Sequence, residues 1–106
     1  MTTVLQPFLS AVGNRWSEVA LVLAERGARS ELRSSGELGK MVIDIECPTH
    51  VALVEAWEHA QCLDVTVLHL ASGESTILSA GPCSSEKEID IRFLALRTAL
   101  LKNEQN

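Results

Sequence analysis

The chain has 106 residues and a formal net charge of −5, with more Asp and Glu than Lys and Arg. This length predicts one domain, residues 1–106, with a single hydrophobic core. The acidic balance argues against nucleic acid as a direct ligand, because binding phosphate requires clustered Lys and Arg. No apolar run approaches the roughly 20 residues that span a bilayer, so we expect no membrane partner.

The cysteines and the N-terminus indicate a cytoplasmic protein. Three cysteines are present, Cys47, Cys62 and Cys83. The N-terminus lacks the basic segment followed by an apolar one that is typical of an export signal. An odd number of cysteines in such a chain indicates reduced thiols in the cytoplasm.

The first predicted element is a helix over residues 4–26. Apolar residues recur there at helical spacing and predict one buried face: Phe8, Val12, Trp16, Val19 and Leu23. Pro7 suits the first turn of a helix, and Gly27 is typical of the residue that follows its last turn. Residues 28–39 mix charged residues with Ser and Gly, which indicates a loop that could begin with a short strand.

From Lys40 onward the apolar residues repeat at every second position, the period of a strand. One face of this strand carries Met41, Ile43, Ile45 and Cys47. The other face carries Val42 and two carboxylates, those of Asp44 and Glu46. Pro48 ends the strand, because proline has no N–H to donate to a sheet.

Residues 50–60 allow two interpretations. As a helix, they would place Leu53, Ala56, Trp57 and Ala60 on one stripe, with Thr49 as N-cap. As a strand, they would place Val51, Leu53, Glu55 and Trp57 on one face. The pattern alone does not decide between these two structures.

The remaining segments predict a hairpin and a helix. Residues 62–70 are rich in β-branched side chains and predict a strand, followed by a turn at Ser72-Gly73-Glu74 and a return strand over residues 76–80. Ser85 and Glu88 form a capping box that opens a helix running to about Lys102. The expected fold is α+β: an N-terminal helix, a four-stranded antiparallel meander sheet and a C-terminal helix, with both helices packed on one sheet face.

Charge is distributed unevenly along the chain. Residues 41–86 contain seven carboxylates and neither Lys nor Arg. A sheet face that only contacts water usually mixes both signs, because opposite charges on neighbouring strands stabilise a sheet. The open face of the sheet is therefore either a solvated surface or a binding surface for a basic partner. The residues expected to bind this partner are Asp44, Glu46, Glu55, Trp57, Glu58, Asp64 and Glu74, with Glu58 and Glu74 near the rim.

Two short motifs resemble the spacing of zinc ligands, Cys47-x2-His50 and His59-x2-Cys62. If a strand joins them, the two pairs lie roughly 25–30 Å apart and cannot share an ion. If a helix joins them, the gap is roughly 12–14 Å, which is still too far unless the chain folds back. His50, His59 and His69 could each be combined with a Ser or Cys nucleophile, but no known catalytic spacing frames them. We therefore expect no enzymatic activity, no metal site and no other cofactor, with a zinc-binding module as a remaining alternative.

A longer stretch, AWEHAQCLDVTVLHLASGE, combines three motifs. Trp57 closes a strand, Cys62-x-Asp64 opens an aliphatic strand, and Ser72-Gly73-Glu74 makes a hairpin turn. This order resembles the TriTu immunity proteins of contact-dependent growth inhibition, over roughly residues 38–100 of this chain. The family tends to have glycine in the turn where this chain has His59-Ala60-Gln61.

The resemblance implies a non-enzymatic inhibitor and a strand over residues 50–58. Such proteins bind the C-terminal nuclease domain of a toxin from a sister cell and block its active site. In this group the toxin is a tRNA-cleaving ribonuclease that works with elongation factor Tu, and all three can form one complex. An acidic sheet suits this partner, because a ribonuclease binds phosphate in a basic cleft. The alternative is an acidic chaperone of the type III secretion kind, which binds an effector segment as a homodimer.

Overall fold

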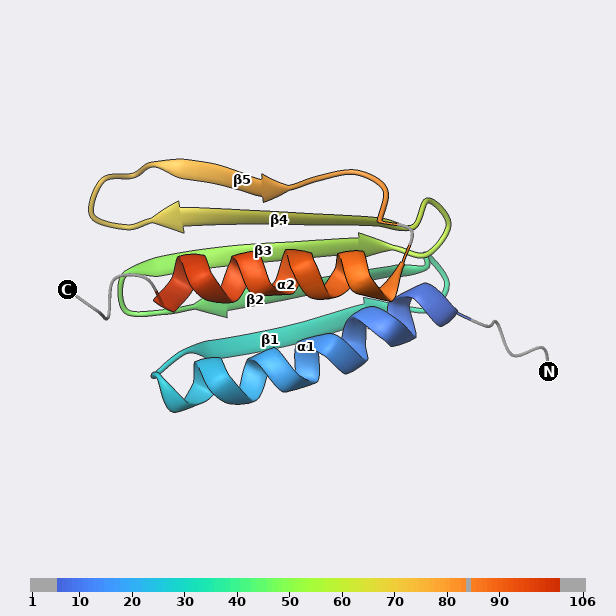
Figure 1. Ribbon diagram of the computed structural model, residues 1–106, viewed down its shortest axis with the longest axis horizontal. Helices are drawn as coiled ribbons and strands as arrows, with labels where there is room; N and C mark the ends of the chain where they lie inside the picture. The colour runs from blue at the N-terminus through green and yellow to red at the C-terminus, as the bar shows by residue number, and fades with distance from the viewer. Residues whose placement is uncertain (1–5, 84, 102–106) are drawn as a thin grey trace.

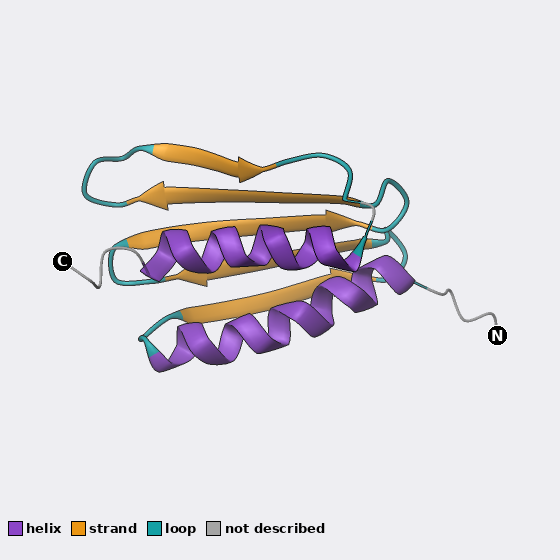
Figure 2. Cartoon of the chain, viewed as in Figure 1, coloured by secondary structure: helices purple, strands orange, loops and turns teal. Residues whose placement is uncertain are grey.

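The computed structural model describes residues 6–83 and 85–101 of the chain. Its elements are α1 (Pro7–Glu25), β1 (Arg29–Ser35), β2 (Lys40–Glu46), β3 (His50–Trp57), β4 (Cys62–His69), β5 (Ser75–Ser79) and α2 (Glu86–Leu101). Figure 1 shows α1 and α2 side by side over one face of the sheet. The fold is therefore α+β with both helices packed on one sheet face, as the sequence predicts (Figure 2).

The sheet has five antiparallel strands in the order β1-β2-β3-β4-β5, so each strand pairs with its neighbour in sequence. The expectation of four strands is wrong, because residues 29–35 form the full strand β1 where the sequence indicated a loop that could begin with a short strand. This edge strand is exposed on both faces except at Ser35, so it lacks the alternation that reveals a half-buried strand. Its pairing with β2, from Arg29↔Glu46 to Ser35↔Lys40, defines it instead.

The strand interpretation of residues 50–57 is confirmed, and the helix interpretation is wrong. β3 pairs along its length with β2 and with β4, so it lies in the centre of the sheet. Its side chains alternate between buried and half-buried positions, as a strand covered on one face requires. This register decides which face each neighbouring carboxylate occupies.

Helix α1 ends in a glycine-dependent motif. Gly27 has a φ of 88°, a left-handed conformation that glycine adopts without strain. The Gly27 N–H donates to the Ala24 carbonyl at 3.1 Å, and the Ala28 N–H donates to the Leu23 carbonyl at 3.0 Å. Both bonds satisfy carbonyls that a helix end leaves free. The predicted helical residues 4 and 5 lie outside the described residues.

Helix α2 begins as its capping box predicts. The Ser85 hydroxyl oxygen accepts a hydrogen bond from the Glu88 N–H at 3.2 Å. The helix is described as far as Leu101, so the predicted last residue, Lys102, lies outside the described residues. Neither helix in the described part of the chain is long and apolar enough to cross a membrane.

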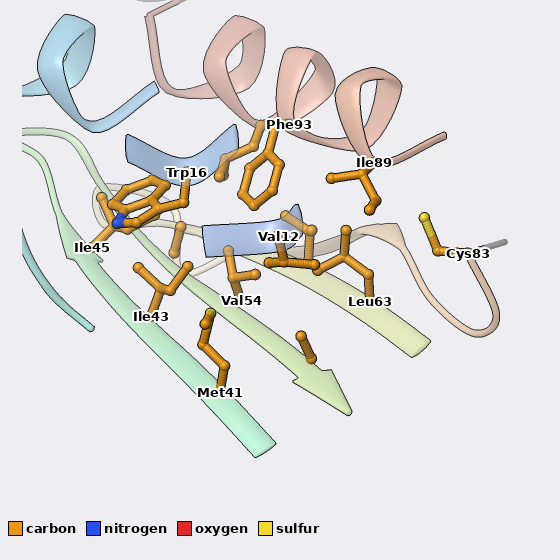
Figure 3. Close-up of a cluster of buried hydrophobic side chains, with 14 of the residues drawn as sticks. Val12, Trp16, Met41, Ile43, Ile45, Val54, Leu63, Cys83, Ile89 and Phe93 are labelled. Carbon is orange, nitrogen blue, oxygen red and sulfur yellow. The ribbon is translucent and has the colours of Figure 1, made fainter. Parts of the chain in front are cut away.

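The hydrophobic core lies between the helices and the sheet (Figure 3). Trp16 of α1 and Phe93 of α2 meet there, with ring centroids 6.2 Å apart and planes tilted by 37°. The predicted face of α1 is buried except for Val19, which is only partly buried. Alternate residues of the central strands form the side of the core that the sheet contributes: Met41, Ile43, Ile45, Val54, Leu63 and Val65. The helices therefore cover one side of the three central strands, β2, β3 and β4, and leave their other side free.

Candidate functional site

The sheet face opposite the helices is named the open face. Antiparallel pairing places alternate residues of each strand on it, side by side across the sheet. Four of the predicted site residues, those whose carboxylates were expected on this face, do lie there: Asp44, Glu46, Glu55 and Asp64. Trp57 also lies on the open face, since it pairs with Lys40 on one side and Cys62 on the other.

A shallow hollow of about 400 Å³ lies on the open face. Its floor is apolar and includes Val51, Leu53 and Leu68. Its border carries three carboxylates, those of Glu31 on β1 and of Asp44 and Glu46 on β2. The same three carboxylates line an adjoining hollow of about 210 Å³ together with Arg29. The hollow therefore combines hydrophobic contact area with negative charge.

Glu31 is a site residue that the sequence analysis missed. It lies directly opposite Asp44 in the β1–β2 pairing, which only the strand structure of residues 29–35 reveals. The available signal was the alternation of charged and neutral residues in Arg29-Ser30-Glu31-Leu32-Arg33, which is typical of a charged edge strand.

Three bases share the open face with five carboxylates. Arg33 forms an ion pair with Asp44, and Lys40 Nζ lies 3.3 Å from a carboxylate oxygen of Glu55. Lys40 also lies over the ring of Trp57, 5.0 Å from its centroid. The expectation of acids without counter-charge is therefore wrong, because bases that precede the acidic segment in sequence pair with it across strands. The face keeps an excess of only two negative charges.

Glu31 and Glu46 are the carboxylates that remain available. Among the described residues, neither side chain forms a hydrogen bond or an ion pair. Arg29 is the register partner of Glu46 but makes no ion pair with it. Both carboxylates line the hollow with the apolar floor, and Arg29 lines the adjoining hollow with them.

Asp64 has a structural contact instead. Its Oδ1 accepts a hydrogen bond from the Gly81 N–H at 2.8 Å. Arg92 of α2 binds the same segment, donating to the carbonyls of Leu63, Gly81 and Pro82 at 2.7, 2.9 and 2.7 Å. The two side chains together hold the connection between β5 and α2 against β4.

Glu58 also binds the backbone of its own chain. Its two carboxylate oxygens accept the N–H groups of Phe8 and Leu9, each at 3.2 Å. These are donors that the first turn of α1 leaves without a helical partner. Negative charge at this position is also favourable toward the helix dipole. Glu58 therefore caps α1, although it was expected at the rim of a binding surface.

Glu74 lies away from the open face. It lines a second hollow, of about 290 Å³, on the side of the sheet that faces the helices. His50 and His69 line the same hollow and lie directly opposite each other on β3 and β4, with ring centroids 4.8 Å apart. Burial, with a smaller effect of the neighbouring His69, lowers the pKa of His50 from its ordinary value. The expectation that Glu74 borders the open face is therefore wrong.

The two motifs with zinc-like spacing do not come together. β3 separates them, so Cys47 and His50 lie at its beginning and His59 and Cys62 beyond its end. In the conformation of the described residues, no three His, Cys, Asp or Glu side chains are grouped to hold a metal ion. His50 instead meets His69, a neighbour that the sequence spacing did not indicate.

Comparison with known protein families, with curated proteins and with solved structures finds no match to this chain. A functional assignment therefore depends on the molecule's own geometry. Its main features are an uncovered sheet face, an apolar hollow in that face, and two carboxylates without partners at the border of the hollow.

Proposed function

We propose that this chain is an immunity protein, a non-enzymatic inhibitor that binds a basic nuclease domain through its open face. The observation that carries this proposal is the hollow with a floor of Val51, Leu53 and Leu68 and with Glu31 and Glu46 at its border. A Lys or Arg side chain fits such a hollow. Its methylene groups pack on the apolar floor while its charged head meets the carboxylates.

The partner in this proposal is the C-terminal ribonuclease domain of a cognate toxin, which cleaves tRNA. The resemblance of residues 56–74 to TriTu immunity proteins supports this choice, and elongation factor Tu would be the third member of the complex. A ribonuclease holds phosphates with Lys and Arg, so carboxylates placed in its cleft exclude the substrate. Inhibition of this kind takes place in the cytoplasm and requires no cofactor.

Trp57 has a defined place in the proposed interface. Its ring lies under Lys40, which also contacts Glu55, so the three side chains form one cluster on the open face, near the end of β3. A partner carboxylate could replace Glu55 on Lys40, and an apolar partner side chain could pack on the exposed part of the indole. Trp57 therefore extends the contact area and leaves the charge recognition to Glu31 and Glu46.

We expect the reading frame immediately upstream to encode a large exported protein with a C-terminal nuclease domain, and the test uses that domain. Its affinity for the purified chain is measured by calorimetry at several salt concentrations. We expect Glu31→Lys with Glu46→Lys to weaken binding by about 100-fold, because close charge pairs contribute roughly 2–5 kcal/mol when one partner is lost. We also expect wild-type binding to weaken as salt increases, and the variant's binding to depend less on salt.

The matched control is Glu18→Lys with Glu25→Lys. These residues lie on α1, and the changes introduce the same charge away from the open face. Equal affinities for the two double variants would contradict the open face as the binding site. Absence of binding by the wild-type chain, together with no protection of cells that express the upstream domain, would contradict the immunity function.

A second candidate function is the homodimeric secretion chaperone, which the free edge of β5 favours. This strand has no charged residue, and its Ile77 is 70% exposed. The opposite edge, β1, carries Arg29, Glu31 and Arg33, and charges of this kind hinder pairing with another chain. Sedimentation equilibrium distinguishes the candidates. A dimer that Ile77→Lys dissociates supports the chaperone, whereas a stable monomer supports the inhibitor.

A further inference from the structure

The hollow beside His50 has the chemistry of a cation site. It lies where β3 begins and β4 ends, and its walls combine the apolar Val67 and Leu78 with His69, Glu74 and His50. No Lys or Arg is among its lining residues, so the ionised group that faces it is the Glu74 carboxylate. Figure 1 shows β5, the strand on the far side of this hollow, at the edge of the sheet that the helices leave uncovered.

Each imidazole in the hollow has one nitrogen occupied and one nitrogen free. The Thr49 hydroxyl lies 2.7 Å from His50 Nδ1, and the Ser72 hydroxyl lies 2.8 Å from His69 Nδ1. Neither Nε2 atom has a hydrogen-bond partner among the described residues. His50 is only 8% exposed as a residue, but its ring lines the open hollow, and its Nε2 is not among the buried atoms that lack a partner. The free nitrogen is therefore accessible to a ligand in the hollow.

We propose that this hollow binds a divalent transition-metal ion of the Zn²⁺ type through the Nε2 atoms of His50 and His69, with Glu74 as third ligand. Two imidazoles on one tetrahedral ion have ring centroids roughly 5 Å apart, given Zn–N bonds of about 2 Å. The observed separation of 4.8 Å already matches this value. The separation of the rings is thus compatible with a shared ion, and binding requires both Nε2 atoms to point toward it.

The hydroxyl groups support the tautomer that metal binding requires. If each Nδ1–H donates to its hydroxyl neighbour, Thr49 or Ser72, the lone pair of each Nε2 is left for the ion. Metal-binding histidines usually make an outer hydrogen bond of this kind, which holds the ring in place. Ser72 is itself fixed, because its oxygen also accepts the Glu74 N–H at 3.2 Å.

Glu74 must rotate to complete the site. The three side chains are not grouped as metal ligands in the conformation described, and Glu74 is exposed in the turn between β4 and β5. A single side-chain rotation in an exposed turn is a small rearrangement, and water fills the remaining coordination position. The site was not expected from the sequence, because His50 and His69 become neighbours only through the β3–β4 register.

The test is calorimetric titration of Zn²⁺ into chelator-treated, reduced protein at pH 7.5. We expect one ion per chain, and we expect His69→Ala to weaken binding by about tenfold or more and Glu74→Gln by a smaller factor. His59→Ala is the matched control, because His59 is exposed beyond the other end of β3 and should leave the affinity unchanged. With Co²⁺, the absorption spectrum should lack the thiolate bands that binding by Cys47 or Cys62 would produce.

Three results would overturn the site: the same affinity in His69→Ala as in the wild type, loss of binding in His59→Ala, or thiolate bands with Co²⁺. Thermal unfolding of the metal-free variants shows whether each one is folded. If His69→Ala is not folded, His69→Gln gives the same comparison, since it removes the imidazole and keeps a polar side chain. Partner binding through the open face is a separate measurement and does not enter this test.

Discussion

The two ends of the sheet use their polar side chains differently. At the end where β3 finishes, which is named the fastened end, Glu58, Asp64 and Arg92 all bind backbone groups of this chain. At the end where β3 begins, which is named the free end, Glu46 has no partner among the described residues and His50 has an unused ring nitrogen. The comparison indicates that one end holds the fold together while the other end is available to ligands.

The chain's connections explain this difference. The fastened end contains the first turns of both helices and the connection from β5 to α2 (Figure 1). Such segments leave N–H and C=O groups that need side-chain partners. At the free end, two short turns satisfy their own backbone. The Cys47 N–H donates to the His50 carbonyl at 2.8 Å, and the His69 N–H donates to the Glu74 carbonyl at 2.9 Å. The Ser72 hydroxyl adds one side-chain contact to the second turn, accepting the Glu74 N–H at 3.2 Å.

The largest expected effect comes from breaking the fastened end at Arg92. Arg92→Leu keeps most of the packing but removes the donors to three carbonyl groups. We expect the free energy of unfolding to fall by about 2–3 kcal/mol, since hydrogen bonds to a charged group contribute roughly 1.5–3 kcal/mol. Urea unfolding monitored by tryptophan fluorescence measures this change. Arg92→Lys should recover only part of the loss, because one ammonium group cannot reproduce the planar fork.

Arg97→Leu is the matched control for this experiment. Arg97 lies on the same helix and is exposed, so the same substitution should change stability by less than about 0.5 kcal/mol. Similar losses for the two variants would mean that the Arg92 contacts do not hold the fastened end.

A smaller effect is expected from two matched carboxylate variants, one at each end. Glu58→Gln removes the negative charge from the first turn of α1, and we expect a loss of about 1 kcal/mol. Glu46→Gln makes the same chemical change at a carboxylate without a partner, and we expect a change below about 0.5 kcal/mol. Chemical unfolding of both variants under one set of conditions gives the difference. A loss in Glu46→Gln equal to that in Glu58→Gln would remove the distinction between the two ends.

Local patterns predicted most of the fold. The stripe of α1, its ending at Gly27, the Ser85 cap of α2 and the alternation in β2 all depend on residues within one or two turns of each other. Such spacing is visible in the sequence. β1 was missed because a strand exposed on both faces shows no alternation of buried and exposed positions. Its assignment depends on its neighbour β2.

The site was predicted less well, because it depends on register. The placement of Asp44 and Glu46 on the open face follows from the alternation within β2 alone. In contrast, the cap joins Glu58 to Phe8 and Leu9, which precede it by 50 and 49 positions. The ion pair of Lys40 with Glu55 joins the neighbouring strands β2 and β3. No local spacing encodes these contacts. Charge counted along the chain therefore overstated the negative charge of the open face.

The smallest expected effect concerns protonation at the free end. Burial, together with the adjacent His69, lowers the pKa of His50, so the folded protein binds a proton on this imidazole less tightly than the unfolded chain does. At pH values between the lowered pKa and the ordinary pKa, the unfolded state therefore holds more bound protons than the folded state. Across this interval the stability decreases as pH falls, and it is fully present only above the ordinary value. Urea unfolding of the metal-free protein should show this decrease, and His50→Gln should show less of it.

A direct measurement is the titration of the His50 ring by NMR in the metal-free protein, folded and then unfolded in urea. We expect the folded midpoint to lie at lower pH. The charged and titratable groups that face this ring are His69 on β4, which lowers its pKa, and Glu74 in the next turn, whose carboxylate would favour the protonated ring if it came into contact. A folded midpoint at or above the unfolded one would contradict the prediction. It would mean that the Glu74 carboxylate rotates onto the imidazole in solution, which is the same movement that the proposed metal site requires.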